Sequence, residues 1–74
     1  MPRRSLDPLT PREREVAGLI GNGASTREIA GQLVISQNTV RLHVERILSK
    51  LGLHSRAQLA AWAVQSSQQS TLAD

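Results

Sequence analysis

The fold is decided by residues 25–53, which read STREIAGQLVISQNTVRLHVERILSKLGL and contain two amphipathic patterns in close succession. Ser25 followed by Glu28 is a capping box, in which each side chain accepts a hydrogen bond from the other residue's backbone N–H. The box predicts a short helix over 27–33. A second, longer helical pattern begins almost at once, so the two helices form a closely joined pair.

The connector between these helices is too short for anything but a crossed arrangement. Residues 34–35 are left for it, because Ser36 is the next N-cap candidate and the following pattern runs to Leu51, where Gly52 supplies a helix end. A helix-turn-helix places its second helix in the major groove of DNA, so the pattern is a DNA-binding signature. The residues spaced to fill the angle between the helices are apolar, with a small one where the axes approach: Ile29, Ala30, Leu33, Ile35 and Val40.

The composition is that of a small domain held together by helix packing alone. The 74 residues make one domain, and the absence of cysteine leaves no disulfide and no thiolate metal site. His43 and His54 lack further ligands, so neither a metal nor a cofactor is expected. A single aromatic residue, Trp62, argues against a single-strand binder, which needs base-stacking side chains. No stretch resembles a membrane span or a signal peptide, so the expected location is the cytoplasm.

The formal net charge of +3 is concentrated on the helix-turn-helix. Residues 25–56 hold five basic and two acidic side chains, whereas the charges of the first predicted helix balance one another. An excess of positive charge on one motif is the electrostatic footprint of a nucleic-acid-binding protein.

The rest of the sequence adds two helices and predicts an all-α fold. A capping pattern at 10–13 starts a first helix, which the Gly-Asn-Gly of 21–23 ends. A similar pattern at 55–58 opens a last helix that runs to about Ser66. The expected organisation is a flexible N-terminal arm, a four-helix domain and a frayed polar tail, at residues 1–8, 9–66 and 67–74.

The third helix divides into two faces when its residues are placed at about 100° each. One side is apolar and must face the core: Val40, Val44, Ile47, Leu48 and Leu51. The opposite side is mostly polar: Asn38, Arg41, Leu42, Glu45, Arg46 and Ser49, with Thr39 and Lys50 at one margin. A leucine amid this polar side fits a major groove, where a thymine methyl is an apolar target; a stray exposed leucine is the alternative.

Four ordered segments resemble the LuxR-type family of bacterial transcriptional regulators, which includes the effector domains of many response regulators and quorum-sensing receptors. They are LTPREREV at 9–16, STREIA at 25–30, ISQNTVRLH at 35–43, and KLGL at 50–53 followed by Ser55-Arg56. The resemblance runs from Leu9 to about Val64. It implies a four-helix domain that binds paired half-sites as a dimer, with the third helix in the major groove and the fourth at the dimer contact.

Two positions depart from the family's pattern. Thr26 stands where the family usually has Asn, which has little bearing on the fold. Glu45 stands where some members place a basic DNA-contacting residue. The base sequence preferred by a relative therefore does not carry over to this chain.

The expected DNA contacts lie on the third helix and at the helix ends around it. Arg41 is the first candidate to read a base, because an arginine fork matches the guanine edge. Glu45 either accepts from cytosine or pairs with Arg41 one turn back, and the pairing is the favoured interpretation. His43, at the edge of the core face, is interpreted as a packed structural residue. The base-contacting candidates are Asn38, Arg41, Leu42 and Glu45; the phosphate-contacting candidates, each of which also fits an ordinary surface residue or cap, are Ser25, Thr26, Thr39, Arg46, Lys50 and Arg56.

The fourth helix has more apolar surface than so small a domain can bury. Leu59 and Ala63 share the side expected to face the core. A second apolar side is expected to meet another copy of the chain in a weak homodimer favoured on DNA, through Ala57, Ala61 and Val64. The expected partners are thus double-stranded DNA and the chain itself, with RNA polymerase as a further candidate.

Three other functions fit less well. An enzyme lacks support, because no nucleophile–base pair and no glycine loop after a strand are evident. A sigma-factor promoter-recognition domain carries a similar first half, but residues 52–56 and the apolar helix after them favour the LuxR type. A protein-interaction bundle would leave the polar side of the third helix without a purpose. The target promoters, the direction of regulation and any sensing domain stay open.

Overall fold

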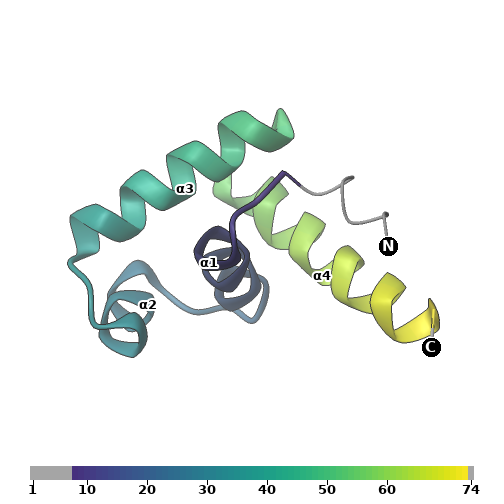
Figure 1. Cartoon of the computed structure of the whole chain (residues 1–74), viewed down its shortest axis with the longest axis horizontal. Helices are drawn as coiled ribbons and strands as arrows, with labels where there is room; N and C mark the ends of the chain where they lie inside the picture. Colours follow the sequence, from purple (N-terminus) through teal and green to yellow (C-terminus); the bar gives the residue numbers. More distant parts are fainter. Residues whose placement is uncertain (1–7, 74) are drawn as a thin grey trace.

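The computed structural model describes residues 8–73, with side chains as far as Ser66. Within this range the chain forms four α-helices and no strand: α1 (Pro11–Gly21), α2 (Thr26–Leu33), α3 (Gln37–Leu51) and α4 (Arg56–Ala73). Figure 1 shows α3 along the top of the molecule, α1 nearly end-on near the centre, α2 beneath the start of α3, and α4 leading away to the C-terminus. The prediction of an all-α, four-helix fold is confirmed.

The first two helices begin at the predicted capping boxes. The Thr10 hydroxyl accepts from the backbone N–H of Glu13 at 3.1 Å, and Glu13 Oε1 accepts from the N–H of Thr10 at 3.0 Å. Ser25 and Glu28 form the same reciprocal pair, at 3.1 and 2.8 Å. Each box satisfies N–H groups that a helix start otherwise leaves free, which fixes where α1 and α2 begin.

The turn between α2 and α3 is as short as predicted. Val34 has a left-handed backbone conformation, with φ 57° and ψ 50°, and the N–H groups of Val34 and Ile35 both donate to the carbonyl of Ala30. α3 follows after Ser36, whose hydroxyl accepts from the N–H of Thr39 at 3.0 Å. A left-handed conformation is costly for a β-branched residue. The packing of the two helices therefore imposes this turn against the preference of Val34.

The start of α4 only half follows the prediction. The Ser55 hydroxyl accepts from the N–H of Gln58 at 3.1 Å, as expected. The Gln58 side chain, however, accepts from the N–H of His54 at 2.6 Å instead of from that of Ser55. Of the two hydrogen bonds of the third capping pattern, the one to the Ser55 hydroxyl forms as predicted, and the one to the Gln58 side chain comes from the preceding residue.

The end of α4 lies beyond the predicted one. The helix continues to Ala73, so the prediction that it ends near Ser66 is wrong. No glycine or proline follows Gly52, so nothing interrupts a helix that gains one hydrogen bond for each residue added. At the other end of the chain, the predicted arm lies outside the described residues except for Pro8.

The core is formed by all four helices and by Leu9, which lies two residues before α1. Its fully buried side chains include Ile29, so truncating that residue to alanine is expected to cost about 2–5 kcal/mol. The side of α3 predicted to face the core does so, with two residues fully buried and Val44, Leu48 and Leu51 half-buried against them. The buried apolar residues are Leu9, Val16, Ala17, Ile20, Ile29, Ala30, Val40, Ile47, Leu59 and Ala63.

Two glycines of α1 face different surroundings. A methyl group on Gly21 would lie 2.8 Å from the Cβ of Ala63, closer than two carbon atoms can approach without repulsion. Glycine at this position therefore permits α1 and α4 to pack together. Gly18 faces open space, and a methyl group there would meet no atom within 4 Å.

Candidate nucleic-acid interface

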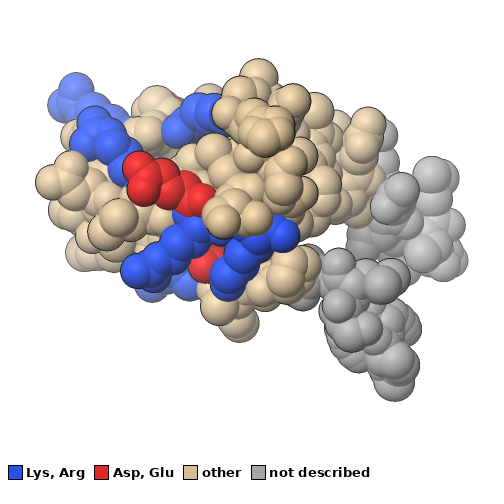
Figure 2. All heavy atoms as spheres, turned by 90° about the horizontal axis from the view of Figure 1, so that it is seen from above, with Lys and Arg blue, Asp and Glu red and all other residues tan. Residues whose placement is uncertain are grey.

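The polar side predicted for α3 is exposed. This holds for every residue assigned to it: Asn38, Arg41, Leu42, Glu45, Arg46 and Ser49. Leu42 keeps 51% of its surface exposed, so it contributes little to the core. Figure 2 looks down on the side of the molecule where α3 lies and shows Lys and Arg side chains gathered over part of it, with acidic side chains between them. The helix thus presents a side that has no packing role and carries mixed polar and apolar groups.

Arg41 is held by a neighbour on its own helix. Its Nη1 donates to Oδ1 of Asn38, one turn towards the N-terminus, at 3.0 Å. The favoured pairing of Arg41 with Glu45 is wrong, because neither residue forms an ion pair within the described part of the chain. Helical side chains lean towards the N-terminus, which brings the arginine head over the first turn of α3. Glu45 is consequently left exposed and without an ion-pair partner among the described residues.

Two of the predicted phosphate contacts on α3 differ in whether the side chain is already hydrogen-bonded within the protein. The hydroxyl of Thr39 lies 2.9 Å from that of Ser36, so it belongs to the capping arrangement at the start of the helix. Arg46 is exposed and forms no hydrogen bond or ion pair with any residue that the structure describes. Of the two, Arg46 has the freer side chain for an anionic ligand.

The N-terminus of α2 combines free backbone donors with nearby positive charge. The backbone N–H groups of Thr26 and Arg27 have no partner among the described residues, because Ser25 serves only the two residues that follow them. The positive end of the helix dipole lies at the same point, which makes such a terminus suited to a phosphate. The side chain of Arg27 is exposed beside it.

Arg56 joins the start of α4 to the start of α2. Its Nη1 donates to Oγ1 of Thr26 and its Nη2 to the carbonyl of Ala24, both at 2.9 Å. The side chain is half-buried. Arg56, which the sequence predicted as a phosphate contact, therefore already bonds to the loop before α2 and to its first residue. A guanidinium has five N–H donors, so some of them remain available for a further partner.

Lys50 ties the end of α3 to the start of α1. Its Nζ lies 2.7 Å from Oε1 of Glu13, the carboxylate that also caps α1, and the Glu13 side chain is almost fully buried. The Lys50 hydrogen bond, followed by that of the Thr10 N–H, lowers the pKa of Glu13 below its ordinary value of 4.5. Among the described residues, the Lys50 ammonium is therefore bonded to Glu13 alone.

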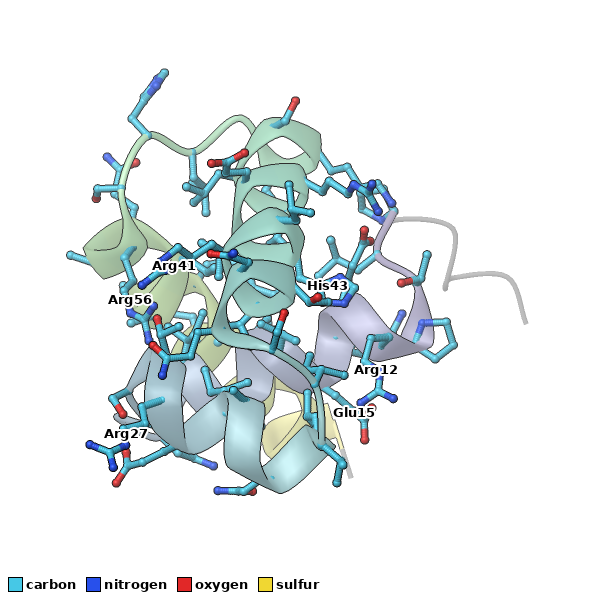
Figure 3. The ribbon with its side chains drawn as sticks, turned by 90° about the vertical axis from the view of Figure 1, so that its left-hand side faces the viewer. Arg12, Glu15, Arg27, Arg41, His43 and Arg56 are labelled. Carbon is cyan, nitrogen blue, oxygen red and sulfur yellow. The ribbon has the colours of Figure 1, made fainter. Side chains whose placement is uncertain are left out.

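Arginines from three different helices lie at one edge of the molecule. Figure 3 shows Arg27 of α2, Arg41 of α3 and Arg56 of α4 on the same side, whereas His43 projects from the opposite side of α3. The sequence singled out Arg41 and Arg56 but assigned no role to Arg27. Its position in the first turn of α2, beside two predicted phosphate contacts, was the signal available.

A helix-turn-helix with an exposed polar second helix and basic residues around it is the arrangement of a DNA-binding domain. Comparison with known proteins identifies which one: the family described as bacterial regulatory proteins, luxR family, matches residues 7–63. The chain belongs to the LuxR family. The resemblance inferred from the four sequence segments is confirmed, and LuxR-family proteins are DNA-binding transcriptional regulators of the helix-turn-helix type.

Curated LuxR-family relatives support the assignment. The chain is 42% identical over 62 residues to the nitrate/nitrite response regulator protein NarL of Escherichia coli (strain K12), covering 84% of this chain and 29% of the relative. It is 49% identical over 51 residues to the nitrate/nitrite response regulator protein homolog of Haemophilus influenzae, covering 69% and 24% respectively. It is 44% identical over 63 residues to the transcriptional regulatory protein LnrK of Bacillus subtilis, covering 85% and 28%. The chain thus spans less than a third of the length of these relatives.

The last helix of this LuxR-family domain has one buried and one exposed apolar side. Leu59 and Ala63 are buried, which confirms their assignment to the core. The residues predicted to meet a second copy are all exposed, and Val64 keeps 41% of its surface open: Ala57, Ala61 and Val64. The side is therefore available for a partner, and the dimer stays a prediction.

The described part of the LuxR-family domain gives no support for a metal site or a membrane-spanning helix. No group of three potential metal ligands occurs there. Nor is any of the described helices long and apolar enough to cross a membrane. His43 is half-buried, and its Nδ1 is buried without a hydrogen-bond partner, as for a side chain placed by packing.

Proposed function

We propose that this chain is a sequence-specific duplex-DNA-binding domain that regulates transcription by placing α3 in the major groove. The observation that carries the proposal is the exposed side of α3, where Arg41 and Leu42 have no role in the core. The major groove is wide enough for an α-helix, and each base pair presents there a distinct set of donors, acceptors and methyl groups. A side with arginines and one exposed leucine matches such a surface.

The proposed base contacts follow from the chemistry of the exposed side chains. Arg41 donates to the two acceptors of a guanine, and Leu42 packs against a thymine methyl. Glu45 has no ion-pair partner in the described residues, which leaves its carboxylate available to accept from a cytosine amino group. Asn38 is exposed on the same side of α3.

The proposed phosphate contacts surround this side of α3. Ser25 and Thr26 offer the N-terminus of α2, whose free N–H groups and dipole suit a phosphate. Arg46 brings a cation that is unpaired among the described residues, and Thr39 brings a hydroxyl. Lys50 is bonded to Glu13, and Arg56 is bonded to Thr26 and Ala24. These two side chains would contact phosphates only through their remaining N–H donors. Such contacts set orientation and carry no sequence information.

The exposed apolar side of α4 supports a weak symmetric dimer assembled on paired half-sites. Ala57 and Ala61 are small and exposed, so two copies of the helix can approach closely around them. Two domains on one duplex would bind more tightly than one, because the second association becomes intramolecular. RNA polymerase is a further proposed partner, in line with the names of the relatives, which are response regulators and transcriptional regulatory proteins.

The experiment is selection of binding sites from random duplexes, followed by anisotropy titrations with wild type and Arg41→Ala. We expect Arg41→Ala to lose about 1–3 kcal/mol on the selected duplex and much less on a random one, since a lost guanine contact affects only specific binding. Equal small losses on both duplexes would make Arg41 a phosphate contact. No binding to any duplex at moderate salt would overturn the function in favour of a protein-interaction bundle.

A further inference from the structure

The hydrogen bond from Arg41 to Asn38, at 3.0 Å, joins two residues of the proposed reading side. We propose that Asn38 is a positioning residue, which holds the Arg41 guanidinium ready for its guanine instead of reading a base itself. The inference rests on the proposed function, because it assigns a role within the same DNA-binding side of α3.

The direction of the bond places the arginine head at the useful end of the helix. Asn38 lies in the first turn of α3, and Arg41 reaches back to it from the next turn. In helix-turn-helix proteins the N-terminal residues of the second helix contact the base edges. A guanidinium held over the first turn is therefore held where α3 would meet the bases.

The chemistry of the partner is also suited to this role. Asn38 is neutral, so it orders Arg41 without cancelling its charge, whereas an ion pair with Glu45 would have to be broken or desolvated in the groove. The bond uses one Nη1 proton, and an arginine side chain has five N–H donors. Enough donors remain for the two bonds of a guanine contact.

The same bond makes Asn38 a poor base reader. An asparagine that reads adenine uses both its carbonyl oxygen and its amino group. In this structure the carbonyl oxygen already accepts from Arg41. A direct contact to a base would have to compete with that bond, so the two roles are alternatives that can be separated by experiment.

The test is a double-mutant cycle with Asn38→Ala, Arg41→Ala and the combined variant on the selected duplex. In a second duplex, one guanine is replaced by 7-deazaguanine, which lacks one of the two acceptors. The guanine chosen is the one at which this replacement weakens DNA binding by the wild type but not by Arg41→Ala. Two quantities are compared: the affinity for the selected duplex and the discrimination between the two duplexes. The bond to Asn38 already orders the Arg41 side chain, so part of the entropic cost of ordering it on binding is avoided. Asn38→Ala should therefore lower discrimination between the two duplexes by about two- to ten-fold.

In the Arg41→Ala background, removing Asn38 should change nothing further, because its effect passes through Arg41. Gln37→Ala is the matched control: it removes an exposed amide next to Asn38 for which the structure shows no side-chain hydrogen bond, and it should leave discrimination unchanged. Circular dichroism and thermal melting of each variant check that α3 is retained.

Each outcome decides the matter. Loss of discrimination that disappears in the Arg41→Ala background supports the positioning role. Additive losses of affinity for the selected duplex would show that Asn38 contacts the DNA itself. Unchanged discrimination by Asn38→Ala would show that the bond has no effect. Either result overturns the inference and leaves the proposed function standing. A wild type that prefers no duplex would overturn the function as well, and that failure is visible before any variant is made.

Discussion

The two ends of α3 are held in different ways. Near its N-terminal end, Arg41 donates to Asn38 on the same helix, and no other bond of Arg41 is found among the described residues. Both side chains are exposed. At its C-terminal end Lys50 reaches across to the nearly buried Glu13, which belongs to α1 and lies 37 residues away in sequence. The polar side chain at the C-terminal end is thus fastened to another helix, while those at the N-terminal end are bonded only within α3 among the described residues. The polar side chains that stabilise the fold and those proposed to read DNA thus lie at opposite ends of one helix.

The largest effect expected from breaking the fastened end comes from Glu13→Ala. The substitution removes the partner of Lys50 and also the acceptor for the Thr10 N–H at the start of α1. Losing a helix cap together with a partly exposed ion pair should lower the free energy of unfolding by about 2 kcal/mol, measured by urea denaturation. DNA affinity of the folded protein should not fall, because neither bond lies at the N-terminal end of α3 and Lys50 loses the carboxylate that compensates part of its charge.

Glu15→Ala is the control, since Glu15 pairs with Arg12 at 3.6 Å on the exposed side of the same helix and should cost no more than about 0.5 kcal/mol. If Glu13→Ala leaves too little folded protein, Gly18→Ala offers a compensating background. A methyl group at Gly18 meets nothing within 4 Å, and the change should restore up to about 1 kcal/mol. Equal losses for the Glu13 and Glu15 variants would show that the end of α3 is not fastened in solution.

A smaller and different effect should separate Lys50 from Arg46. Arg46 is free among the described residues, so Arg46→Ala should flatten the dependence of log affinity on log salt by about one unit. Lys50→Ala should flatten it less, because Glu13 already compensates part of the Lys50 charge, and it should lower stability by about 1 kcal/mol. Identical slopes for the two variants would mean that Lys50 leaves Glu13 when DNA binds.

The smallest effect concerns pH. The pKa of Glu13 is lowered below 4.5, chiefly by Lys50 and then by the Thr10 N–H, so its carboxylate stabilises the fold at neutral pH. That contribution is complete above the unfolded-state pKa and is lost as the pH falls through the folded-state pKa. The difference in unfolding free energy between wild type and Glu13→Gln should therefore be constant near neutral pH and shrink below about pH 4.5. A difference that does not vary with pH would locate the effect in packing instead of charge.

The local parts of this fold could be predicted from the sequence. Capping boxes involve residues three apart, so Ser25 with Glu28 fixes the start of α2 without knowledge of anything else. The exposed and buried sides of α3 follow from helical geometry alone, and the structure agrees with both. The end of α4 was missed because polar residues without glycine or proline neither require nor forbid a helix.

The non-local parts of the site could not be predicted. Arg56 and Lys50 were recognised as basic residues near the DNA-binding motif, but their partners lie 30 and 37 residues away and are brought close only by folding. Arg41 had two possible partners on its own helix, Asn38 three residues before it and Glu45 four residues after it. Both spacings allow contact, so the sequence alone offered no means of choosing the one that the structure shows.

The close packing of Gly21 against Ala63 has an evolutionary consequence. With a methyl group on Gly21 only 2.8 Å from the Ala63 Cβ, these two positions share one small volume although they lie on different helices. A mutation to a larger residue at either position is tolerated only where α1 and α4 separate or the other position compensates. The two positions should therefore change together among descendants of this sequence, and a lineage that gains a side chain at position 21 should show a shifted α4 and an altered surface for its partner.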